Sequence, residues 1–220
     1  MVRRRKEGAY CGIVCKKIMH VIIIGGTGHV GTYLVPRLVE DGYRITVITR
    51  GQREPYLQHG AWRSVQKLSI DRTAEEQAGT FGQKIRDLKP DVVIDMICFN
   101  PESARHLVEA LRGKVQHFLS CGSVWVHGTG IQIPITENQP RHPIGEYGIQ
   151  KAEIESYLIE EARKNNFPAT IVHPGHIVGC GWIPLNPIAN FNPNVYVKLA
   201  KGEELEILLL GKSLLIYVKR

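Results

Sequence analysis

Short apolar runs alternate with longer amphipathic segments along most of the chain. Six runs have the length and composition of strands, at residues 20–24, 44–49, 64–70, 91–97, 115–121 and 169–173. Four segments between them have helical spacing of apolar side chains, at residues 29–41, 74–88, 101–112 and 147–165. Gly79 and Gly82 interrupt the second of these helices. Because strands that alternate with helices form right-handed crossovers, the pattern predicts an α/β fold with a doubly wound parallel sheet.

A cluster of glycines joins the first predicted strand to the first predicted helix. Its residues fit GxxGxxG spacing from Gly25 and GxGxxG spacing from Gly26. In this position glycines allow a tight turn and a close approach of the backbone to a pyrophosphate, which the helix amides then face. A glycine-rich turn without a ligand is the alternative, and the strand–loop–helix context disfavours it. The loop predicts a Rossmann-type nicotinamide dinucleotide site formed by Gly25, Thr27, Gly28, His29, Val30 and Gly31.

Charged residues at two strand ends bear on the identity of the dinucleotide. An NAD enzyme usually has an acid at the end of the second strand, where it binds the ribose 2′-hydroxyl, but this chain has Arg50 with Arg53 close behind. A guanidinium suits a 2′-phosphate, which favours NADP over NAD unless Arg50 is only a solvated strand-end charge. Asp71 follows the third strand and is expected near the adenine.

Candidate catalytic residues lie on the longest predicted helix and after the fifth strand. Tyr147 and Lys151 are four residues apart and share one helix face. A cation beside a phenol, together with an oxidised nicotinamide ring, is expected to lower the tyrosine pKa from about 10 towards neutrality. A YxxxK pair also occurs by chance, and the glycine loop favours the catalytic interpretation. Ser123 lies at the carboxyl edge of the sheet, where its hydroxyl can hold a substrate oxygen.

Three stretches of the chain have the order and spacing of motifs from a known family. They are the glycine loop at residues 24–31, the serine segment at residues 119–128 and the segment EYGIQK at residues 146–151. On these residues the chain resembles, over about residues 19–215, the extended branch of the short-chain dehydrogenase/reductase family, the NAD-dependent epimerase/dehydratase group.

The resemblance implies a role for each candidate catalytic residue. Tyr147 would be the acid and base, Lys151 would bind the nicotinamide ribose and steady the tyrosinate, and Ser123 would orient the reacting oxygen. Asn100 is similar to the family's helix-four asparagine, although its place next to Pro101 is equally well explained by helix capping.

The chain departs from the family pattern on the expected substrate side. Dehydratases of the family have Thr-Asp-Glu where this chain has Ser123, Val124 and Trp125, so water elimination is not expected. His127 replaces the usual tyrosine and His173 the usual arginine. The resemblance implies an NAD(P)-dependent epimerase or reductase that transfers hydride on a sugar nucleotide or a small carbonyl or alcohol. The alternative is a dinucleotide-sensing regulator or RNA-associated binding protein on the same fold.

The two ends of the chain differ from its middle. Residues 1–18 hold six basic residues and one acid, a net +5 of the chain's +7, and we expect this extension to be disordered and Met19 to be the natural start. Residues 19–178 are predicted to be the dinucleotide-binding domain. Turn-rich sequence follows, and residues 179–220 match only the beginning of the family's smaller C-terminal substrate domain. We therefore expect a chain that is truncated at its C-terminus.

Composition argues against several other classes of protein. The remaining +2 over residues 19–220 gives no electrostatic case for binding nucleic acid. The longest apolar stretch near the end, residues 205–218, is shorter than the about 20 residues that a bilayer span needs. Five cysteines without paired spacing, and histidines without carboxylates or cysteines at ligand spacing, predict no disulfide framework and no metal site. The expected partner is a small-molecule substrate in the cytoplasm, and a homodimer is the assembly that we consider.

Overall fold

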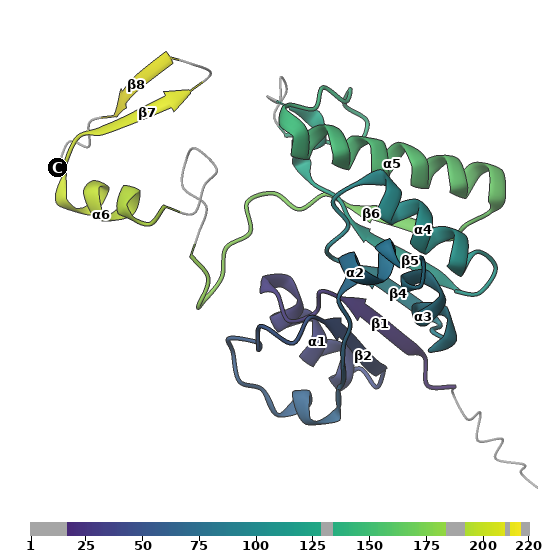
Figure 1. Ribbon diagram of the computed structural model, residues 1–220. Coiled ribbons are helices and arrows are strands. Elements are labelled where there is room, and N and C mark those ends of the chain that lie inside the picture. Colours follow the sequence, from purple (N-terminus) through teal and green to yellow (C-terminus); the bar gives the residue numbers. More distant parts are fainter. Residues whose placement is uncertain (1–16, 129–133, 184–191, 210–211, 217–220) are drawn as a thin grey trace, which may run out of the picture.

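The computed structural model describes residues 17–128, 134–183, 192–209 and 212–216, so nearly all of the predicted extension at residues 1–18 lies outside the described residues. The described part contains a six-stranded sheet in the order β3-β2-β1-β4-β5-β6, with every neighbouring pair parallel. Its strands are β1 (His20–Ile24), β2 (Arg44–Thr49), β3 (Gln66–Ser69), β4 (Val92–Asp95), β5 (His117–Cys121) and β6 (Ala169–Val172). The predicted doubly wound parallel sheet is therefore confirmed (Figure 1).

The strand order reverses at β1, which lies between β2 and β4 at the centre of the sheet. Every residue of β1 is buried, which explains why this strand is a continuous β-branched run instead of an alternating one. From the centre, the chain runs outward to β3 on one side and to β6 on the other. In an open α/β sheet, such a reversal leaves a crevice outside the carboxyl ends of the strands, where ligands bind.

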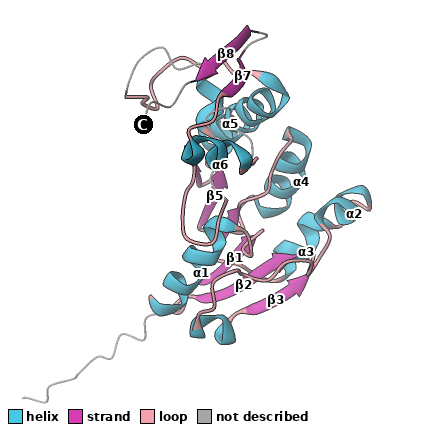
Figure 2. Ribbon diagram, turned by 90° about the vertical axis from the view of Figure 1, so that its left-hand side faces the viewer, coloured by secondary structure: helices cyan, strands magenta, loops and turns pink. Residues whose placement is uncertain are grey.

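Helices cover both faces of the sheet and pack on alternate side chains of β1 (Figures 1 and 2). Val21 and Ile23 pack with Val35 of the first helix on one face, whereas Ile22 and Ile24 belong to the cluster on the other face. That second cluster includes side chains of three helices, α3, α4 and α5. The helices of this part of the chain are α1 (His29–Glu40), α2 (Arg72–Gln77), α3 (Phe81–Asp87), α4 (Pro101–Leu111) and α5 (Gly145–Asn165).

The single weak helix expected at residues 74–88 is two helices, α2 and α3. Gly79 has a positive φ of +70° and lies in the turn that separates them. Gly82, in contrast, lies inside α3, where an added Cβ would come within 2.7 Å of the Ala110 Cβ and 2.8 Å of the His106 carbonyl oxygen. One glycine therefore ends a helix, and the other lets α3 pack closely against α4.

Smaller elements complete the described part of the chain. The expected third strand begins later than residue 64, because Ser64 is the last residue of the 3-10 helix η1 (Gly60–Ser64). A second 3-10 helix, η2 (Val124–His127), follows β5. Beyond β6, the helix α6 (Asn194–Lys201) precedes a separate antiparallel pair, β7 (Leu205–Leu209) and β8 (Lys212–Ile216). The domain boundary at residue 178 stays a prediction. Among the described helices, none has the length and apolar character that crossing a membrane requires.

Candidate active site

The glycine loop forms the turn between β1 and α1, at the point where the strand order reverses. Gly28 is the N-cap of α1, and its carbonyl oxygen accepts a hydrogen bond of 2.9 Å from the Thr32 amide. A Cβ on Gly31 would lie 2.0 Å from the Gly26 carbonyl oxygen, whereas a Cβ on Gly28 would meet only the Gly25 carbonyl oxygen, at 3.4 Å. The helix is therefore pressed against the loop at Gly31, and open space faces Gly28. A helix N-terminus with free space before it fits the phosphates of a dinucleotide.

A cavity of about 410 Å³ opens beside the glycine loop at the carboxyl ends of β2 and β3. Gly25, Thr27 and Gly28 line it from the loop, and Arg50 and Asp71 line it from the two strand ends. Residues that the sequence assigns to the phosphates, the ribose and the adenine thus surround one cavity. This arrangement fits the adenosine end of a dinucleotide.

Two predicted phosphate-loop residues direct their side chains elsewhere. The buried His29 ring stacks on Trp182, with centroids 4.6 Å apart and planes 13° apart, and it forms a hydrogen bond with the Tyr56 hydroxyl. Burial lowers the pKa of His29, which favours the neutral ring. His29 and Val30 line a different cavity, with Val178. Their side chains are therefore not part of the glycine-loop cavity, and a contact with phosphate would come from their backbone.

The three predicted catalytic residues come together beyond the carboxyl end of β5. Ser123 is the N-cap of η2, and its hydroxyl accepts a hydrogen bond of 3.2 Å from the Trp125 amide. Tyr147 lies in the first turn of α5 and is 45% exposed, and its interaction with the Ser123 side chain acts to lower its pKa. Lys151 follows one turn later, with its Nζ 5.7 Å from the centre of the Tyr147 ring. The spacing of these residues in the sequence thus corresponds to proximity in the fold.

Lys151 is held by the edge of the sheet. Its side chain is only 2% exposed, and its Nζ donates hydrogen bonds of 2.7 Å to the carbonyl oxygens of Cys98 and Cys121. Burial lowers the pKa of Lys151, and the two carbonyl oxygens offset part of the cost of removing its charge from water. An ammonium group has three N–H donors, so the two bonds fix its position and leave one donor for another acceptor.

The pKa of Tyr147 in the chain without a dinucleotide lies above its ordinary value, and its expected decrease beside an oxidised nicotinamide ring stays a prediction. Burial raises the pKa, and the interaction with the Ser123 side chain opposes this effect without cancelling it. The ammonium of Lys151 is directed at two backbone carbonyls, so it stabilises the phenolate less than a direct ion pair would. In the chain without a dinucleotide, the phenol is therefore protonated at neutral pH.

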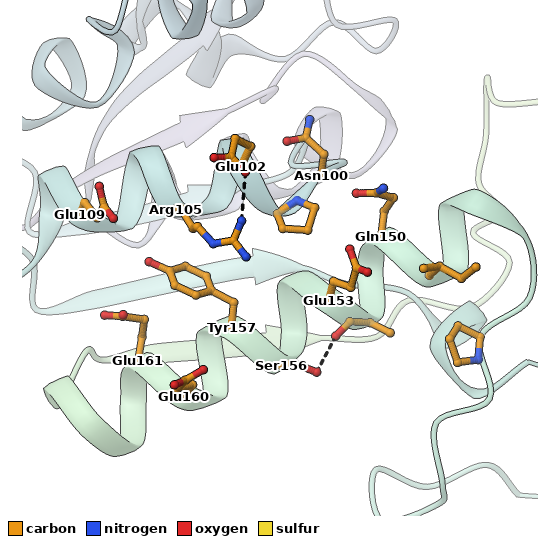
Figure 3. A pocket seen from close by; sticks show the side chains of 14 residues that line it. Asn100, Glu102, Arg105, Glu109, Gln150, Glu153, Ser156, Tyr157, Glu160 and Glu161 are labelled. Carbon is orange, nitrogen blue, oxygen red and sulfur yellow. Dashed lines mark hydrogen bonds and ion pairs between the residues drawn. The ribbon is translucent and has the colours of Figure 1, made fainter.

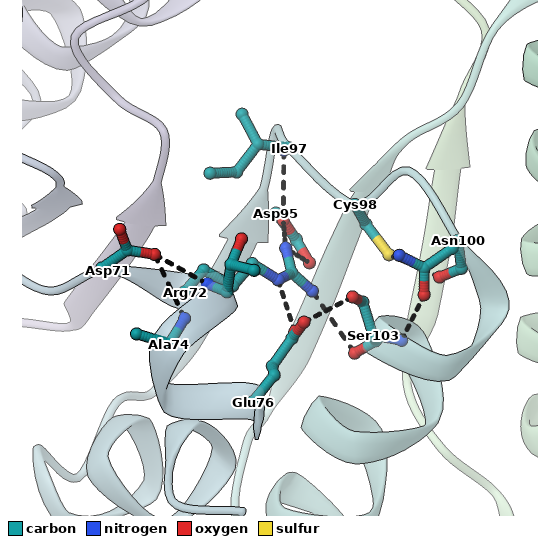
Figure 4. Close-up of polar contacts among 10 residues, drawn as sticks. Asp71, Arg72, Ala74, Glu76, Asp95, Ile97, Cys98, Asn100 and Ser103 are labelled. Carbon is teal, nitrogen blue, oxygen red and sulfur yellow. Dashed lines mark hydrogen bonds and ion pairs between the residues drawn. The ribbon is translucent and has the colours of Figure 1, made fainter. Parts of the chain in front are cut away.

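Sequence reasoning missed a buried ion-pair network beside the glycine-loop cavity (Figure 4). Arg72 donates to both carboxylate oxygens of Asp95, at 2.9 and 3.0 Å, and to Glu76 at 2.6 Å. Ser103 accepts from Arg72 through its carbonyl oxygen and donates to Glu76 through its hydroxyl. Burial acts to lower the pKa of Arg72, but Asp95, Cys98 and Glu76 together outweigh burial and raise the pKa. The signal in the sequence was an aspartate at the end of an otherwise apolar strand.

Two other polar residues near this network are helix caps (Figure 4). The Asp71 carboxylate accepts hydrogen bonds from the amides of Thr73 and Ala74, at 2.9 and 3.3 Å, while it also lines the cavity. The Asn100 side chain accepts a hydrogen bond of 2.9 Å from the Ser103 amide at the start of α4. The capping interpretation of Asn100 is therefore confirmed.

The two histidines that depart from the family pattern lie near one buried glutamate. His173 bonds to Glu155 at 2.9 Å, and the His127 ring lies edge-on to His173 with centroids 5.5 Å apart. Arg141 binds the other carboxylate oxygen of Glu155 at 2.5 Å. Burial acts to raise the pKa of Glu155, but its bonds with His173 and Arg141 lower it overall. Within the described residues, no three His, Cys, Asp or Glu side chains are grouped as a metal site requires.

A larger cavity, of about 1040 Å³, lies between α4 and α5 (Figure 3). The predicted catalytic residues and the glycine loop do not line it, and all but one of its charged side chains are acidic. The charged side chains in it are Glu102, Arg105, Glu109, Glu153, Glu160 and Glu161. No phosphate-binding loop lines this cavity. The candidate active site is therefore the glycine-loop cavity together with Ser123, Tyr147 and Lys151, which lie beyond β5 at the same edge of the sheet.

Comparison with known proteins assigns the chain to a family. A family model described as the NAD dependent epimerase/dehydratase family matches residues 21–216. The chain belongs to this family. Its predicted membership is therefore confirmed, and so is the relation of the fold to dinucleotide-dependent enzymes.

Proteins similar to this chain include a reductase, an epimerase and a stem-loop binding protein. The 2'-dehydrokanamycin reductase of Streptomyces kanamyceticus is 27% identical over 163 residues, which cover 74% of this chain and 44% of that protein. The UDP-glucose 4-epimerase of Lactobacillus helveticus is 24% identical, with coverage of 73% and 52%. The chloroplast stem-loop binding protein of 41 kDa b of Arabidopsis thaliana is 24% identical, with coverage of 79% and 44%. The chain thus spans about half the length of these relatives.

Solved structures with low sequence identity to this chain share its fold. The UDP-glucose 4-epimerase of Thermotoga maritima, solved with UDP-glucose, has a TM-score of 0.66 at 22% identity, with coverage of 88% of this chain and 67% of that chain. The enzyme WbmG of Bordetella bronchiseptica, solved with NAD, has a TM-score of 0.64 at 19% identity, with coverage of 88% and 63%. At these identities the likeness shows the α/β fold.

Proposed function

We propose that this chain carries the dinucleotide-binding and catalytic part of an NAD(P)-dependent epimerase or reductase. The observation that supports the proposal is the grouping of Ser123, Tyr147 and Lys151 beyond the end of β5, on the same sheet edge as the glycine-loop cavity. A bound nicotinamide dinucleotide would supply the acceptance and return of a hydride. In this proposal Ser123 orients the reacting oxygen, Tyr147 moves its proton, and the third N–H of Lys151 binds the nicotinamide ribose.

The raised pKa of Tyr147 defines when the residue can act in each direction. A protonated phenol is ready to donate a proton to a substrate oxygen, which is the step that accompanies reduction of a carbonyl. To act as a base, Tyr147 must first lose its proton, and a positive charge nearby favours this loss. The ammonium of Lys151 is directed at two carbonyl oxygens instead of the Tyr147 hydroxyl, so in this proposal the positive charge that favours ionisation of Tyr147 belongs to the oxidised nicotinamide ring.

The experiment that tests this mechanism is the replacement Tyr147→Phe, with Tyr157→Phe on the same helix as the matched control. We expect Tyr147→Phe to lower turnover of carbonyl and UDP-sugar probe substrates by about 10²–10⁴-fold, because acid–base catalysis contributes this much. Dinucleotide binding, measured by calorimetry, should stay within about twofold, because the phenol contributes one hydrogen bond at most. Tyr157→Phe should leave both unchanged. Unchanged turnover in Tyr147→Phe would remove the mechanism.

A second readout does not depend on turnover. The ultraviolet absorbance of the phenolate reports the ionisation of tyrosine directly. Adding the oxidised dinucleotide should make one phenolate appear at lower pH, and Tyr147→Phe should abolish that change while Tyr157→Phe retains it. A change that persists in Tyr147→Phe would assign the ionisation to another tyrosine and contradict the proposal.

We propose NADP as the preferred cofactor, because Arg50 and Arg53 line the cavity at the end of β2. Calorimetric titration with NAD, NADH, NADP and NADPH tests this directly. Arg50→Ser should weaken the binding of NADPH by about tenfold or more, since a hydrogen bond to a charged group contributes about 1.5–3 kcal/mol. The same replacement should hardly affect the binding of NADH. Arg63→Ser, outside the cavity, is the control. A preference of the unaltered chain for NAD would overturn the assignment.

The identity of the substrate is proposed at the level of its class. A sugar nucleotide is supported by the epimerase relatives, and a small carbonyl or alcohol by the reductase relative. In this proposal residues 179–220 begin the part of the enzyme that closes over the substrate.

We also propose a cytoplasmic homodimer, for which sedimentation at several concentrations is the direct test of the assembly.

A second candidate function is a dinucleotide-sensing or RNA-associated protein, which the likeness to the stem-loop binding protein supports. The weak net charge of the chain after residue 18 argues against a large phosphate-binding surface. A mobility-shift assay with an RNA stem-loop at physiological salt separates the two functions. RNA binding that remains in Tyr147→Phe, together with absent turnover in the unaltered chain, would favour the second.

A further inference from the structure

Phe99 is an exposed aromatic residue at the carboxyl edge of the sheet. It lies four residues beyond the end of β4, and 53% of its surface is exposed although the strand before it is largely buried. It lines the glycine-loop cavity together with Gly25 and Gly28. A large apolar side chain left exposed in a cavity beside a phosphate-binding loop has the character of a ligand contact.

The same ring also contacts the catalytic residues. The Lys151 Nζ lies 5.0 Å from the centre of the Phe99 ring, within the range of a cation–π interaction. The Tyr147 ring lies 6.4 Å away, centre to centre, at an angle of 44°. Phe99 therefore lines the cavity beside the glycine loop and also lies next to Tyr147 and Lys151. The ring is thus within reach of a molecule that extends from the glycine loop towards Tyr147.

We infer that Phe99 stacks on the nicotinamide ring and selects the oxidised, positively charged form of the dinucleotide over the reduced form. The inference rests on the proposed function, which directs the nicotinamide end of the dinucleotide towards Tyr147. An aromatic ring carries negative charge density on its faces, so it attracts a cationic ring more strongly than a neutral ring of the same shape. The reduced ring is neutral and gains only apolar contact. Phe99 is thus a specificity-determining residue for the redox state of the cofactor.

Lys151 adds a constraint to this arrangement. Its ammonium already interacts with the Phe99 ring and is fixed by the carbonyls of Cys98 and Cys121. The exposed part of the ring is the part that remains for a ligand. A second cation there would share the electron density of the ring with Lys151, so the ring would lie between two positive groups and reduce their mutual repulsion.

The test measures the dissociation constants of the oxidised and reduced dinucleotide in the full chain, by calorimetry, for three proteins. Phe99→Leu keeps an apolar side chain but removes the aromatic face, and Phe99→Trp provides a stronger one. We expect Phe99→Leu to weaken the binding of the oxidised dinucleotide by about three- to tenfold, the range typical of partly buried cation–π contacts. The binding of the reduced dinucleotide should weaken by less than about twofold. Phe99→Trp should shift the ratio of the two constants in the opposite direction.

Several outcomes would overturn the inference. Equal weakening of both forms in Phe99→Leu would make Phe99 an apolar support without redox selectivity, and no weakening of either would place the nicotinamide elsewhere. A raised KM for the substrate with unchanged dinucleotide binding would make Phe99 a substrate contact. Failure of the proposed function can be told apart from failure of this inference. Absent dinucleotide binding in the unaltered chain would overturn the proposed function and the inference about Phe99. Full turnover in Tyr147→Phe would overturn only the proposed mechanism, because the effect of Phe99 on the ratio of the two dissociation constants is measured independently.

Discussion

Two glycines of the phosphate loop should respond differently to the same added methyl group. Gly28 has a φ of −77°, which any L-residue adopts, and a Cβ there would meet only one carbonyl oxygen, at 3.4 Å. A Cβ on Gly31 would lie 2.0 Å from the carbonyl oxygen and 2.4 Å from the carbonyl carbon of Gly26. Gly28→Ala should therefore impair dinucleotide binding in a stable protein, whereas Gly31→Ala should destabilise the fold.

The expected magnitudes follow from these distances. Gly31→Ala cannot be relieved by a shift of Gly26, since the space beside Gly26 is filled by Val47 and Ile23 at about the distance of a tight contact. Overpacking of this kind costs about 1–3 kcal/mol or more. For a chain of this size, 1 kcal/mol lowers the Tm by about 2–4 °C, so a decrease of several degrees is expected.

Gly28→Ala changes stability little, because two small effects oppose each other. Alanine is a poorer N-cap than glycine, which costs roughly 0.5–1 kcal/mol, but it also restricts the unfolded chain, which stabilises by about 0.4–1 kcal/mol. The methyl group occupies the space where a pyrophosphate would approach the backbone. Losing one charge-assisted hydrogen bond of about 1.5–3 kcal/mol weakens binding by about ten- to a hundredfold.

The assay is thermal unfolding by circular dichroism, with and without saturating dinucleotide, together with calorimetric titration. Binding of the dinucleotide should raise the Tm of the unaltered protein. Without dinucleotide, Gly28→Ala should have the same Tm as the unaltered protein, but added dinucleotide should raise it much less. Gly31→Ala should begin at a lower Tm. Normal affinity in a well-folded Gly28→Ala protein would refute the placement of the phosphates, and a normal Tm in Gly31→Ala would refute the packing argument.

Two further predictions concern buried charges. Asp95→Asn should lower the free energy of unfolding by about 3–5 kcal/mol in urea titrations, because it leaves the buried charge of Arg72 without its main partner; a loss below about 1 kcal/mol would contradict this. Glu155 has a pKa below its ordinary value of 4.5 owing to His173 and Arg141, so its stabilising contribution is fully present above pH 4.5 and is lost as the pH falls through the folded-state pKa. The stability difference between the unaltered chain and Glu155→Gln should therefore narrow below pH 4.5, and a difference that does not change with pH would disprove this account.

The strands were predictable because burial on both faces leaves a direct trace in the sequence. The run of β1 is apolar throughout, and each of its side chains is buried. The segment at residues 74–88 was predicted less well, since Gly79 and Gly82 look alike in the sequence. The first ends a helix through its positive φ, and the second permits close packing of α3 on α4. That distinction depends on a neighbouring helix, which local sequence does not reveal.

The site shows the same limit at the level of chemistry. Helical spacing was enough to predict that Tyr147 and Lys151 lie on one face, but the partners of the ammonium are carbonyl oxygens of Cys98 and Cys121, 53 and 30 residues away in the chain. These bonds hold the positive charge at the sheet edge, and burial consequently dominates the pKa of Tyr147 and raises it. A direct ion pair with Lys151 would instead favour the phenolate and lower the pKa of Tyr147. In the proposed mechanism, the positive charge of an oxidised dinucleotide supplies the stabilisation of the phenolate that Lys151 does not, so binding of the oxidised form should lower the pKa of Tyr147.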